Sequence, residues 1–438
     1  MTYHYDYSKP FTTIGKTNWR NTNQLFGIKL NDRYSHIYAL GKTGSGKSSL
    51  LLNMAIDDIH KGYSVVLIEP HGDACLTLLD HIPEHRKHDV VYFNATDTAH
   101  PTGFNPLHDV PTEDRHLVAS EIVLSFKKIW IDSWGPRLEY ILRYAILTLL
   151  DYPDATLLDI QPLLLDQEFR NTVLHHTNNI ALLSFWHNEF DRYPASLKAE
   201  AIMPILNKAG VFRANTILKN IVGQPQGISF DEILNTRKIL IVNLSKGIIG
   251  EDISQLLGSL ITTGIQAAAM RRAKLPEAER NPCAVYIDEC HAFITNSFAS
   301  MLSEIRKYKI SLFLANQFLD QLPDDVRSAI IGNVGTICCF RLGTADAKIM
   351  ADEFYPVFTT DDFINLPRYC IYLKLLIDGM ASRPFSAETL PLPSCSNSVK
   401  DFIIANSRRV YSKEPVDVAP VVHHRGTAPL DTTMPTLF

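Results

Sequence analysis

The stretch that decides the fold reads Gly41-Lys42-Thr43-Gly44-Ser45-Gly46-Lys47-Ser48. It matches the pattern G-x-x-x-x-G-K-S/T at every position. A short apolar run at residues 35–40 precedes it, and apolar residues at helical spacing follow it over residues 49–59. Because a strand, a glycine-rich loop and a helix in this order are the context of a phosphate-binding loop, the stretch predicts a nucleotide site in an α/β fold rather than a turn without function.

The residue types in this loop suit the chemistry of a triphosphate. Glycines let the backbone turn tightly and direct its N–H groups at phosphate oxygens. We expect Lys47 to reach the β- and γ-phosphates and the Ser48 hydroxyl to bind Mg²⁺. The expected ligands are therefore ATP and Mg²⁺. The residues predicted to bind the nucleotide are Gly41, Lys42, Thr43, Gly44, Ser45, Gly46, Lys47, Ser48 and Ser49.

An acidic pair, Asp288-Glu289, follows the apolar run at residues 284–287. Asp288 is predicted to orient Mg²⁺ together with Ser48, and Glu289 is predicted to polarise the attacking water as a general base. Acidic pairs after strands are common by chance. The catalytic interpretation rests on finding this pair in the same α/β pattern as a complete phosphate-binding loop.

Three further side chains are candidates for a role in hydrolysis. Gln317 ends another apolar run and is predicted to act as a sensor of the γ-phosphate or the attacking water, although such an amide can also satisfy loop backbone groups. Hydrolysis of this kind often needs an arginine from a neighbouring subunit. Arg341 and Arg33 are the candidates, and the alternative for each is an arginine at the surface or in a salt bridge.

Alternating strand and helix signals predict a doubly wound α/β core with a mainly parallel sheet. Strands are expected at residues 35–40, 64–68, 89–93, 238–244, 283–287, 311–315, 335–341 and 368–377. The last of these is expected to close the sheet or extend its edge. The domains expected are an N-terminal extension (1–30), two parts of an ATPase core (31–107 and 226–390), an inserted all-α domain (108–225), and a C-terminal helix with a mobile proline-rich tail (391–438).

Composition limits the other possibilities. The chain has 438 residues and a formal net charge of −5, so any nucleic-acid contact must come from positive charge concentrated locally, for instance inside a ring. None of the seven cysteines has C-x-x-C spacing, and we expect no metal other than nucleotide-bound Mg²⁺. No run of about 18 apolar residues occurs, so we expect no direct membrane span and a cytoplasmic location.

The order of motifs resembles the HerA/FtsK superfamily of hexameric motor ATPases. Within it, the likeness is greatest to the DNA-binding domain of conjugative type IV secretion coupling proteins, and it extends from residue 31 to about residue 409. The motifs that carry it are Asp32-Arg33, His36, the phosphate-binding loop, Glu69-Pro70-His71-Gly72-Asp73, Phe104-Asn105-Pro106-Leu107, Trp134-Gly135-Pro136-Arg137, Leu244-Ser245-Lys246-Gly247, Ile287-Asp288-Glu289, Ala315-Asn316-Gln317 and Ser407-Arg408-Arg409-Val410-Tyr411.

The resemblance implies a RecA-like core with an all-helical insertion, assembled as a homo-hexamer that moves DNA through a central channel. Gln317 would match the sensor of that superfamily. Arg341 would match an arginine that reaches into the adjacent subunit's site. Lys246 would face the channel, although a solvated loop lysine is an equal alternative. Implied partners are DNA bound without sequence preference and a relaxosome or secretion channel.

Two departures from the family leave other functions open. Coupling proteins commonly carry N-terminal transmembrane helices, which this sequence lacks, and Glu69 stands where they usually have aspartate. The chain is therefore expected in the cytoplasm, docked on the inner membrane only through a partner. Beside conjugative DNA transfer, the alternatives are a motor for DNA-end processing or defence with a separate nuclease, and an ATPase that energises protein export. The intact acidic pair argues against a purely structural ATP switch.

Overall fold

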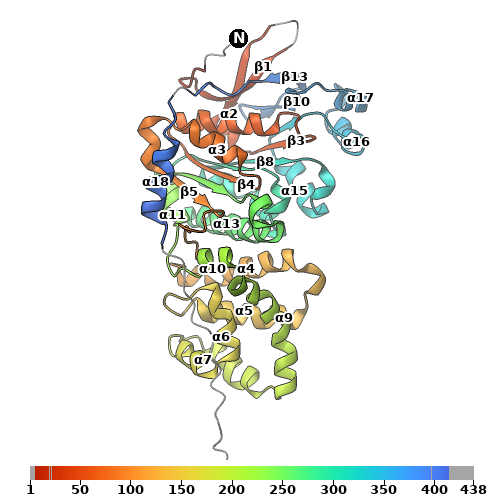
Figure 1. Cartoon of the computed structure of the whole chain (residues 1–438). Helices are drawn as coiled ribbons and strands as arrows, with labels where there is room; N and C mark the ends of the chain where they lie inside the picture. Colours follow the sequence, from red (N-terminus) through yellow and green to blue (C-terminus); the bar gives the residue numbers. More distant parts are fainter. Residues whose placement is uncertain (1–4, 19, 21, 396, 414–438) are drawn as a thin grey trace, which may run out of the picture.

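The computed structural model describes residues 5–18, 20, 22–395 and 397–413. Across its main sheet of eleven strands, the order is β2-β1-β13-β10-β9-β3-β8-β7-β4-β6-β5 (Figure 1). The strands from β9 to β5 in this order run parallel. They are β9 (Thr336–Cys339), β3 (Ile37–Leu40), β8 (Ile310–Asn316), β7 (Cys283–Ile287), β4 (Ser64–Glu69), β6 (Ile239–Asn243) and β5 (Val90–Asn94). The tail predicted to be mobile lies mostly at residues 414–438, outside the described residues.

The central strands are buried on both faces, as their continuous apolar sequences predicted. Every residue of β3, β4 and β7 is buried. Successive residues of β3 enter different hydrophobic clusters on the two faces of the sheet. Tyr38 and Leu40 belong to one cluster, and Ile37 and Ala39 belong to the other. The predicted α/β core with a mainly parallel sheet is therefore confirmed.

The other end of the sheet is antiparallel and was not foreseen. β10 (Cys370–Lys374), β13 (Phe385–Thr389), β1 (Phe11–Thr17) and β2 (Leu25–Lys29) continue the sheet beyond β9, each antiparallel to its neighbours. β10, which we expected at the edge or closing the sheet, therefore lies inside it. Two strands also come from the segment that we assigned to an N-terminal extension. They escaped notice because β1 carries few large apolar residues and pairs with β13 from the far end of the chain.

Helices cover both faces of the sheet (Figure 1). One face packs against α2 (Lys47–His60), α3 (Asp73–Asp80) and α18 (Lys400–Tyr411). The opposite face packs against α13 (Glu251–Arg271), α14 (Asn296–Met301) and α15 (Asp324–Asn333). After α14 ends at Met301, a separate 3-10 turn follows at Ile305–Tyr308. The remaining elements of the core are α1 (Leu30–Arg33), α11 (Phe230–Asn235), α12 (Lys246–Ile249), α16 (Thr344–Glu353), α17 (Thr360–Ile364) and the hairpin β11 (Leu376–Ile377) and β12 (Met380–Ala381).

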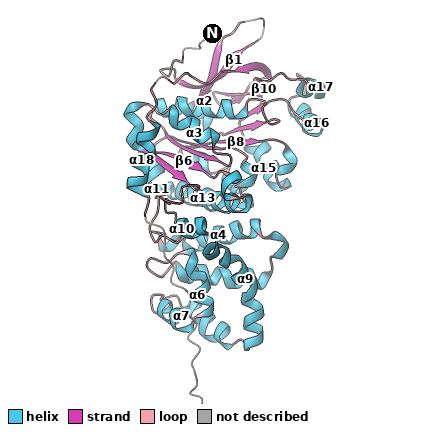
Figure 2. Ribbon diagram, viewed as in Figure 1, coloured by secondary structure: helices cyan, strands magenta, loops and turns pink. Residues whose placement is uncertain are grey.

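Every regular element between Thr112 and Val222 is helical, and all of these residues are described. Figure 2 shows these helices as a separate lobe beyond α13, here called the helical domain. Its first helix, α4, packs along α13 of the core. Within the described part of the chain, no helix combines the length and the apolar character that crossing a membrane requires. The α-helices of the domain are α4 (Arg115–Ile129), α5 (Pro136–Leu149), α6 (Ile160–Leu165), α7 (Gln167–Leu174), α8 (Ile180–Ser184), α9 (Ala195–Ala214) and α10 (Thr216–Val222).

A buried ion pair ties the antiparallel end of the sheet to its centre. Arg33 is 1% exposed, and its Nη1 lies 2.6 Å from Oδ2 of Asp58 on α2. Tyr286 of β7 donates its hydroxyl to the same carboxylate at 2.6 Å, and Thr12 of β1 donates to the other oxygen at 2.8 Å. Burial by itself lowers the pKa of Arg33, but the Asp58 carboxylate raises the pKa above its usual range. The hypothesis that Arg33 serves a neighbouring subunit's site is therefore wrong, because its guanidinium is enclosed in its own chain.

Replacing this arginine should destabilise the fold strongly. Arg33→Met leaves the Asp58 carboxylate buried without its cation, and we expect the free energy of unfolding to fall by about 3–5 kcal/mol. Denaturant titration measures the change. The matched control is Lys29→Met, which removes an exposed pair with Asp378 and should change stability little. An Arg33→Met chain as stable as the Lys29→Met chain would contradict this role.

Candidate functional site

The predicted site residues lie at one edge of the sheet, because three neighbouring parallel strands end there. β8 lies between β3 and β7, with Leu40 opposite Asn316 and Ile287 opposite Leu314. The segments that leave these strands are the phosphate-binding loop after β3, the acidic pair after β7 and Gln317 after β8. The carboxyl ends of parallel strands are where open α/β sheets bind ligands.

The loop has the backbone form that its glycines predicted. Gly46 adopts a φ of 123° just before α2 begins, a conformation that L side chains rarely adopt. A Cβ on Gly41 would lie 2.5 Å from the Cβ of Phe340, so only glycine fits there without movement. The loop ends at the N-terminus of α2, where unpaired N–H groups and the helix dipole favour an anion.

The Lys47 ammonium is buried at the centre of this loop. It donates to the Gly41 carbonyl and lies 3.4 Å from the Lys42 carbonyl. Burial lowers the pKa of Lys47, and the nearby carboxylates of Asp288 and Glu289 oppose that shift. The Lys47 ammonium therefore lies among main-chain oxygens and carboxylates, within reach of a phosphate held by the loop.

Ser48 and Asp288 meet across the site. The Ser48 hydroxyl donates to Oδ2 of Asp288 at 3.1 Å, which brings a hydroxyl and a carboxylate oxygen to one point. Burial, and then the Glu289 carboxylate, raise the pKa of Asp288. Among the described residues, no cluster of three or more His, Cys, Asp or Glu side chains forms a metal site. One hydroxyl and one carboxylate oxygen suit a cation such as Mg²⁺, which takes few protein ligands and completes its shell with phosphates and water.

A chain of hydrogen bonds joins the loop to the acidic pair through Gln317. Its Oε1 accepts from the Thr43 hydroxyl at 2.9 Å, and its Nε2 donates to Oε1 of Glu289 at 2.8 Å. Glu289 itself adopts a left-handed backbone with a φ of 49°, which is uncommon outside glycine. The amide of Gln317 therefore spans the distance between the phosphate-binding loop and the predicted base.

Arg341 lies beside the loop of its own chain. Its carbonyl accepts from the Lys42 N–H at 2.9 Å, and its side chain lines a cleft of about 590 Å³ together with Thr43 and Gln317. A role in a neighbouring subunit's site stays a prediction, since this position also faces the site of the same chain.

Sequence reasoning missed two residues that contact the loop. Arg368 donates from Nε to the Gly44 carbonyl at 2.9 Å, and Tyr369 donates its N–H to the Ser45 carbonyl at 2.9 Å. Both residues precede β10 directly. Because β10 is antiparallel to β9, its beginning lies at the same edge as the ends of the parallel strands. No motif marks them, and only the strand direction could have revealed them.

Glu69 ends β4 two strands away from β8 and is enclosed by its own turn. Its carboxylate accepts from the main-chain N–H groups of His71, at 2.7 Å, and Gly72. Burial raises the pKa of Glu69 to about 7, and those two hydrogen bonds oppose the shift. The charge of the Asp288 carboxylate also raises the pKa of Glu69.

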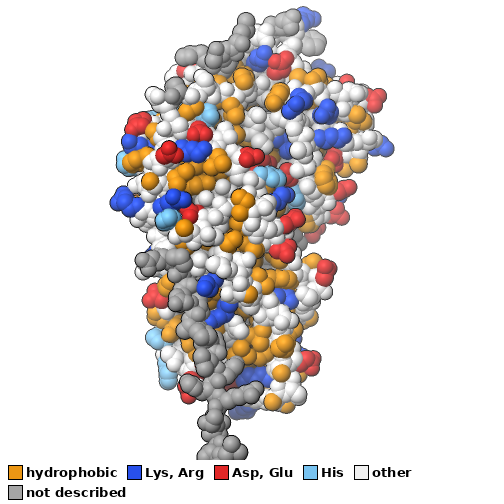
Figure 3. Space-filling view, viewed as in Figure 1, with side chains coloured by type: hydrophobic (Ala, Val, Ile, Leu, Met, Phe, Trp, Pro, Cys, Tyr) orange, Lys and Arg blue, Asp and Glu red, His pale blue; other side chains and the backbone are white. Residues whose placement is uncertain are grey.

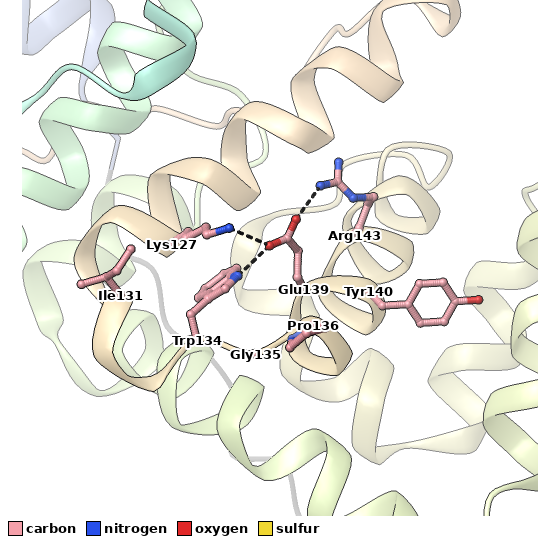
Figure 4. A pocket seen from close by; sticks show the side chains of 8 residues that line it. All are labelled: Lys127, Ile131, Trp134, Gly135, Pro136, Glu139, Tyr140 and Arg143. Carbon is pink, nitrogen blue, oxygen red and sulfur yellow. Dashed lines mark hydrogen bonds and ion pairs between the residues drawn. The ribbon is translucent and has the colours of Figure 1, made fainter. Parts of the chain in front are cut away.

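Other motifs from the sequence lie away from this edge. His36 is buried before the start of β3, where Nε2 lies 2.8 Å from the Leu302 carbonyl and Nδ1 accepts from the Leu312 N–H at 3.2 Å. Trp134 lines a hollow of about 540 Å³ in the helical domain (Figure 4). There the Glu139 carboxylate receives the Trp134 indole N–H at 2.8 Å.

Comparison with known proteins finds solved structures with the same fold but no relative by sequence. No protein-family model matches the chain, and no curated protein matches its sequence. An unbound bacterial conjugative coupling protein, TrwB, is 16% identical with a TM-score of 0.61, covering 85% of this chain and 88% of that one. The plasmid coupling protein TrwB with the ATP analogue ADPNP is 15% identical with a TM-score of 0.62, covering 91% and 97%.

A third solved structure is VirB4 of Thermoanaerobacter pseudethanolicus. It is 14% identical with a TM-score of 0.61, and the match covers 88% of this chain and 98% of that one. Identities this low establish the fold alone, but each match covers most of this chain and most of the chain with which it is compared. The chain therefore has the RecA-like P-loop fold that the conjugative coupling protein TrwB and VirB4 also have.

Proposed function

We propose that the chain hydrolyses ATP and uses the energy to move DNA through a ring of six copies, in conjugative transfer. The observation that carries the hydrolytic part is the convergence of three strand ends on one point. Ser48 and Asp288 meet there at 3.1 Å, and Gln317 joins Glu289 to the loop. These are the parts that phosphoryl transfer to water requires: a phosphate cradle, a cation site and a general base.

Each side chain has a distinct task in this proposal. The loop N–H groups and Lys47 bind the phosphates, while Ser48 and Asp288 hold Mg²⁺. The cation, when bound, supplies positive charge against the charge that develops on the phosphate oxygens. Glu289 accepts the proton of the attacking water, and the Gln317 amide orients that water.

The choice of ATP and Mg²⁺ has support beyond the residues themselves. Structures of TrwB that share this fold contain ADPNP in one case and ADP with Mg²⁺ in another. In this chain, the Ser48–Asp288 pair offers one hydroxyl and one carboxylate, which fits Mg²⁺ better than a metal that needs several protein ligands.

The DNA part of the proposal rests on the sequence motifs and on the fold shared with a conjugative coupling protein. The net charge is −5, and Figure 3 shows basic side chains interspersed with acidic ones on the visible face. Binding without sequence preference requires Lys or Arg at the phosphates. We therefore assign the contacts to loops lining a channel, with the exposed Lys246 as the candidate. A relaxosome or secretion channel would dock the ring at the inner membrane.

The base assignment gives a sharp test. Glu289→Gln should bind ATP normally but lower the turnover number by about 10²–10⁴-fold, because the amide cannot accept the proton of water. Phosphate release measures turnover, and titration of the nucleotide measures affinity. The matched control is Glu277→Gln, an exposed carboxylate before the opposite end of β7, which should behave as wild type. Normal turnover by Glu289→Gln would refute its role as base.

The DNA assignment is tested by ATP turnover with and without single- or double-stranded DNA. We expect DNA to raise turnover, with a smaller effect at higher salt because the contacts are to phosphates. Lys246→Ala should reduce the DNA-dependent part, whereas Lys274→Ala, at an exposed position elsewhere, should not. If DNA does not change the rate of ATP turnover at any salt concentration, the chain would still be an ATPase, but the proposal that it moves DNA would be contradicted. The protein-export alternative would then be favoured.

The ring is tested by mixing two inactive variants. Arg341→Ala supplies an intact Lys47, and Lys47→Ala supplies an intact Arg341, so mixed rings should regain part of the activity if the arginine acts between subunits. A mass measurement confirms that mixed rings form. Mixed rings without recovery would contradict the role of Arg341 in a neighbouring subunit's site.

A further inference from the structure

The position of the Glu289 carboxylate depends on a short turn that follows it. The Glu289 carbonyl accepts from the Ala292 N–H at 2.9 Å. The Cys290 carbonyl then accepts from the N–H groups of Phe293, at 3.1 Å, and Ile294, at 3.0 Å. One carboxylate oxygen, Oε1, receives Gln317, while Oε2 accepts no hydrogen bond from the described residues. Residues 289–294, here called the base turn, therefore set where the carboxylate lies.

A lysine from the helical domain holds the far end of the base turn. The ammonium of Lys128 on α4 donates to the carbonyls of His291, at 2.9 Å, and Ile294, at 2.7 Å. Carbonyls at the end of a short helical turn lack partners within it, and a cation there also complements the local dipole. Lys128 therefore connects the helical domain directly to the segment that carries the predicted base.

The face of α4 that carries Lys128 is attached to the core at two more points. The Ser125 hydroxyl lies 3.3 Å from that of Thr263 on α13, and Oε2 of Glu121 accepts from the Ser297 hydroxyl at 2.7 Å. Residues 121, 125 and 128 lie on one helix face because they are spaced by four and three positions. A movement of α4 would therefore be transmitted to the base turn.

The preceding lysine on α4, Lys127, faces the helical domain instead. Nζ of Lys127 lies 3.3 Å from Oε2 of Glu139 on α5, in the hollow shown in Figure 4. Arg143 lies 3.2 Å from the other oxygen of the same carboxylate. Two adjacent lysines of α4 thus face different environments, the hollow for Lys127 and the base turn for Lys128.

The surroundings of Lys128 favour a positioning role over a role in stability. Its two hydrogen-bond acceptors are neutral carbonyls, and burial lowers its pKa to about 7. Burial, and then the charge of Lys128, lower the pKa of His291 to about 4, so the imidazole beside Glu289 is neutral. Replacing Lys128 with an apolar side chain would remove the donor of two carbonyls but would leave no carboxylate unpaired, so the loss of stability should be smaller than for a buried ion pair.

We propose that Lys128 is a positioning residue through which the helical domain sets the Glu289 carboxylate for its reaction with water. The inference rests on the proposed hydrolysis of ATP and names the route by which the helical domain would regulate it.

The test compares Lys128→Met with Lys127→Met in the full chain. Lys128→Met should lower the turnover number for ATP by about tenfold or more, since displacing a catalytic group slightly is costly, and should leave KM within about twofold. Lys128→Arg keeps the positive charge and should restore much of the turnover. Lys127→Met should behave as wild type. Hydrogen exchange at the Phe293 and Ile294 amides should become faster in Lys128→Met and stay unchanged in Lys127→Met.

The outcomes separate the two proposals. Wild-type turnover in Lys128→Met, or unchanged exchange of the two amides, would overturn the role of Lys128 while leaving the ATPase intact. Equal losses in Lys128→Met and Lys127→Met would also overturn it, because the effect would then belong to the helical domain as a whole. A wild-type chain that does not hydrolyse ATP would instead overturn the proposed function.

Discussion

The register between β3 and β8 places Leu40 opposite Asn316, and the site depends on this alignment. It brings the phosphate-binding loop and Gln317 to one level, and the adjoining register between β8 and β7 brings Glu289 to the same level. A slip of one residue would turn each strand's side chains to the opposite face, so the buried alternation of β3 holds the alignment in place. Packing in the core thus determines geometry at the edge, where the polar side chains meet.

Much of the core could be predicted because its signals are local. The strand, loop and helix around Lys47 are contiguous, and the fully apolar strands could only be buried on both faces of a sheet. The acidic pair followed from the same logic, since a polar side chain directly after a buried strand must emerge at its end. Parallel strands place such ends together, so the neighbours of Asp288 at this edge could be predicted without knowing the strand order.

What escaped prediction depends on contacts between distant segments. β1 and β13 pair across almost the whole described chain, and neither carries a strong apolar pattern. Arg368 reaches the loop only because β10 runs antiparallel to β9. No residue of β10 indicates this direction. The sequence offers Arg33 as a candidate for catalysis, since nothing in it shows that Asp58 and Tyr286 enclose the guanidinium. Lys128 had no motif at all, and its partners are main-chain carbonyls, which any sequence provides.

The pairing of β1 with β13 has a consequence for how the chain is made. A ribosome releases β1 long before β13 exists, so the antiparallel end of the sheet stays open during most of synthesis. The Thr12 hydroxyl that joins Asp58 belongs to β1, and so even the buried Arg33 cluster is complete only when β1 has docked. Contacts this far apart in sequence close slowly, because a long loop must be ordered before they form. Until then the unpaired edges of β1 and β10 are places where two nascent chains can pair with each other instead.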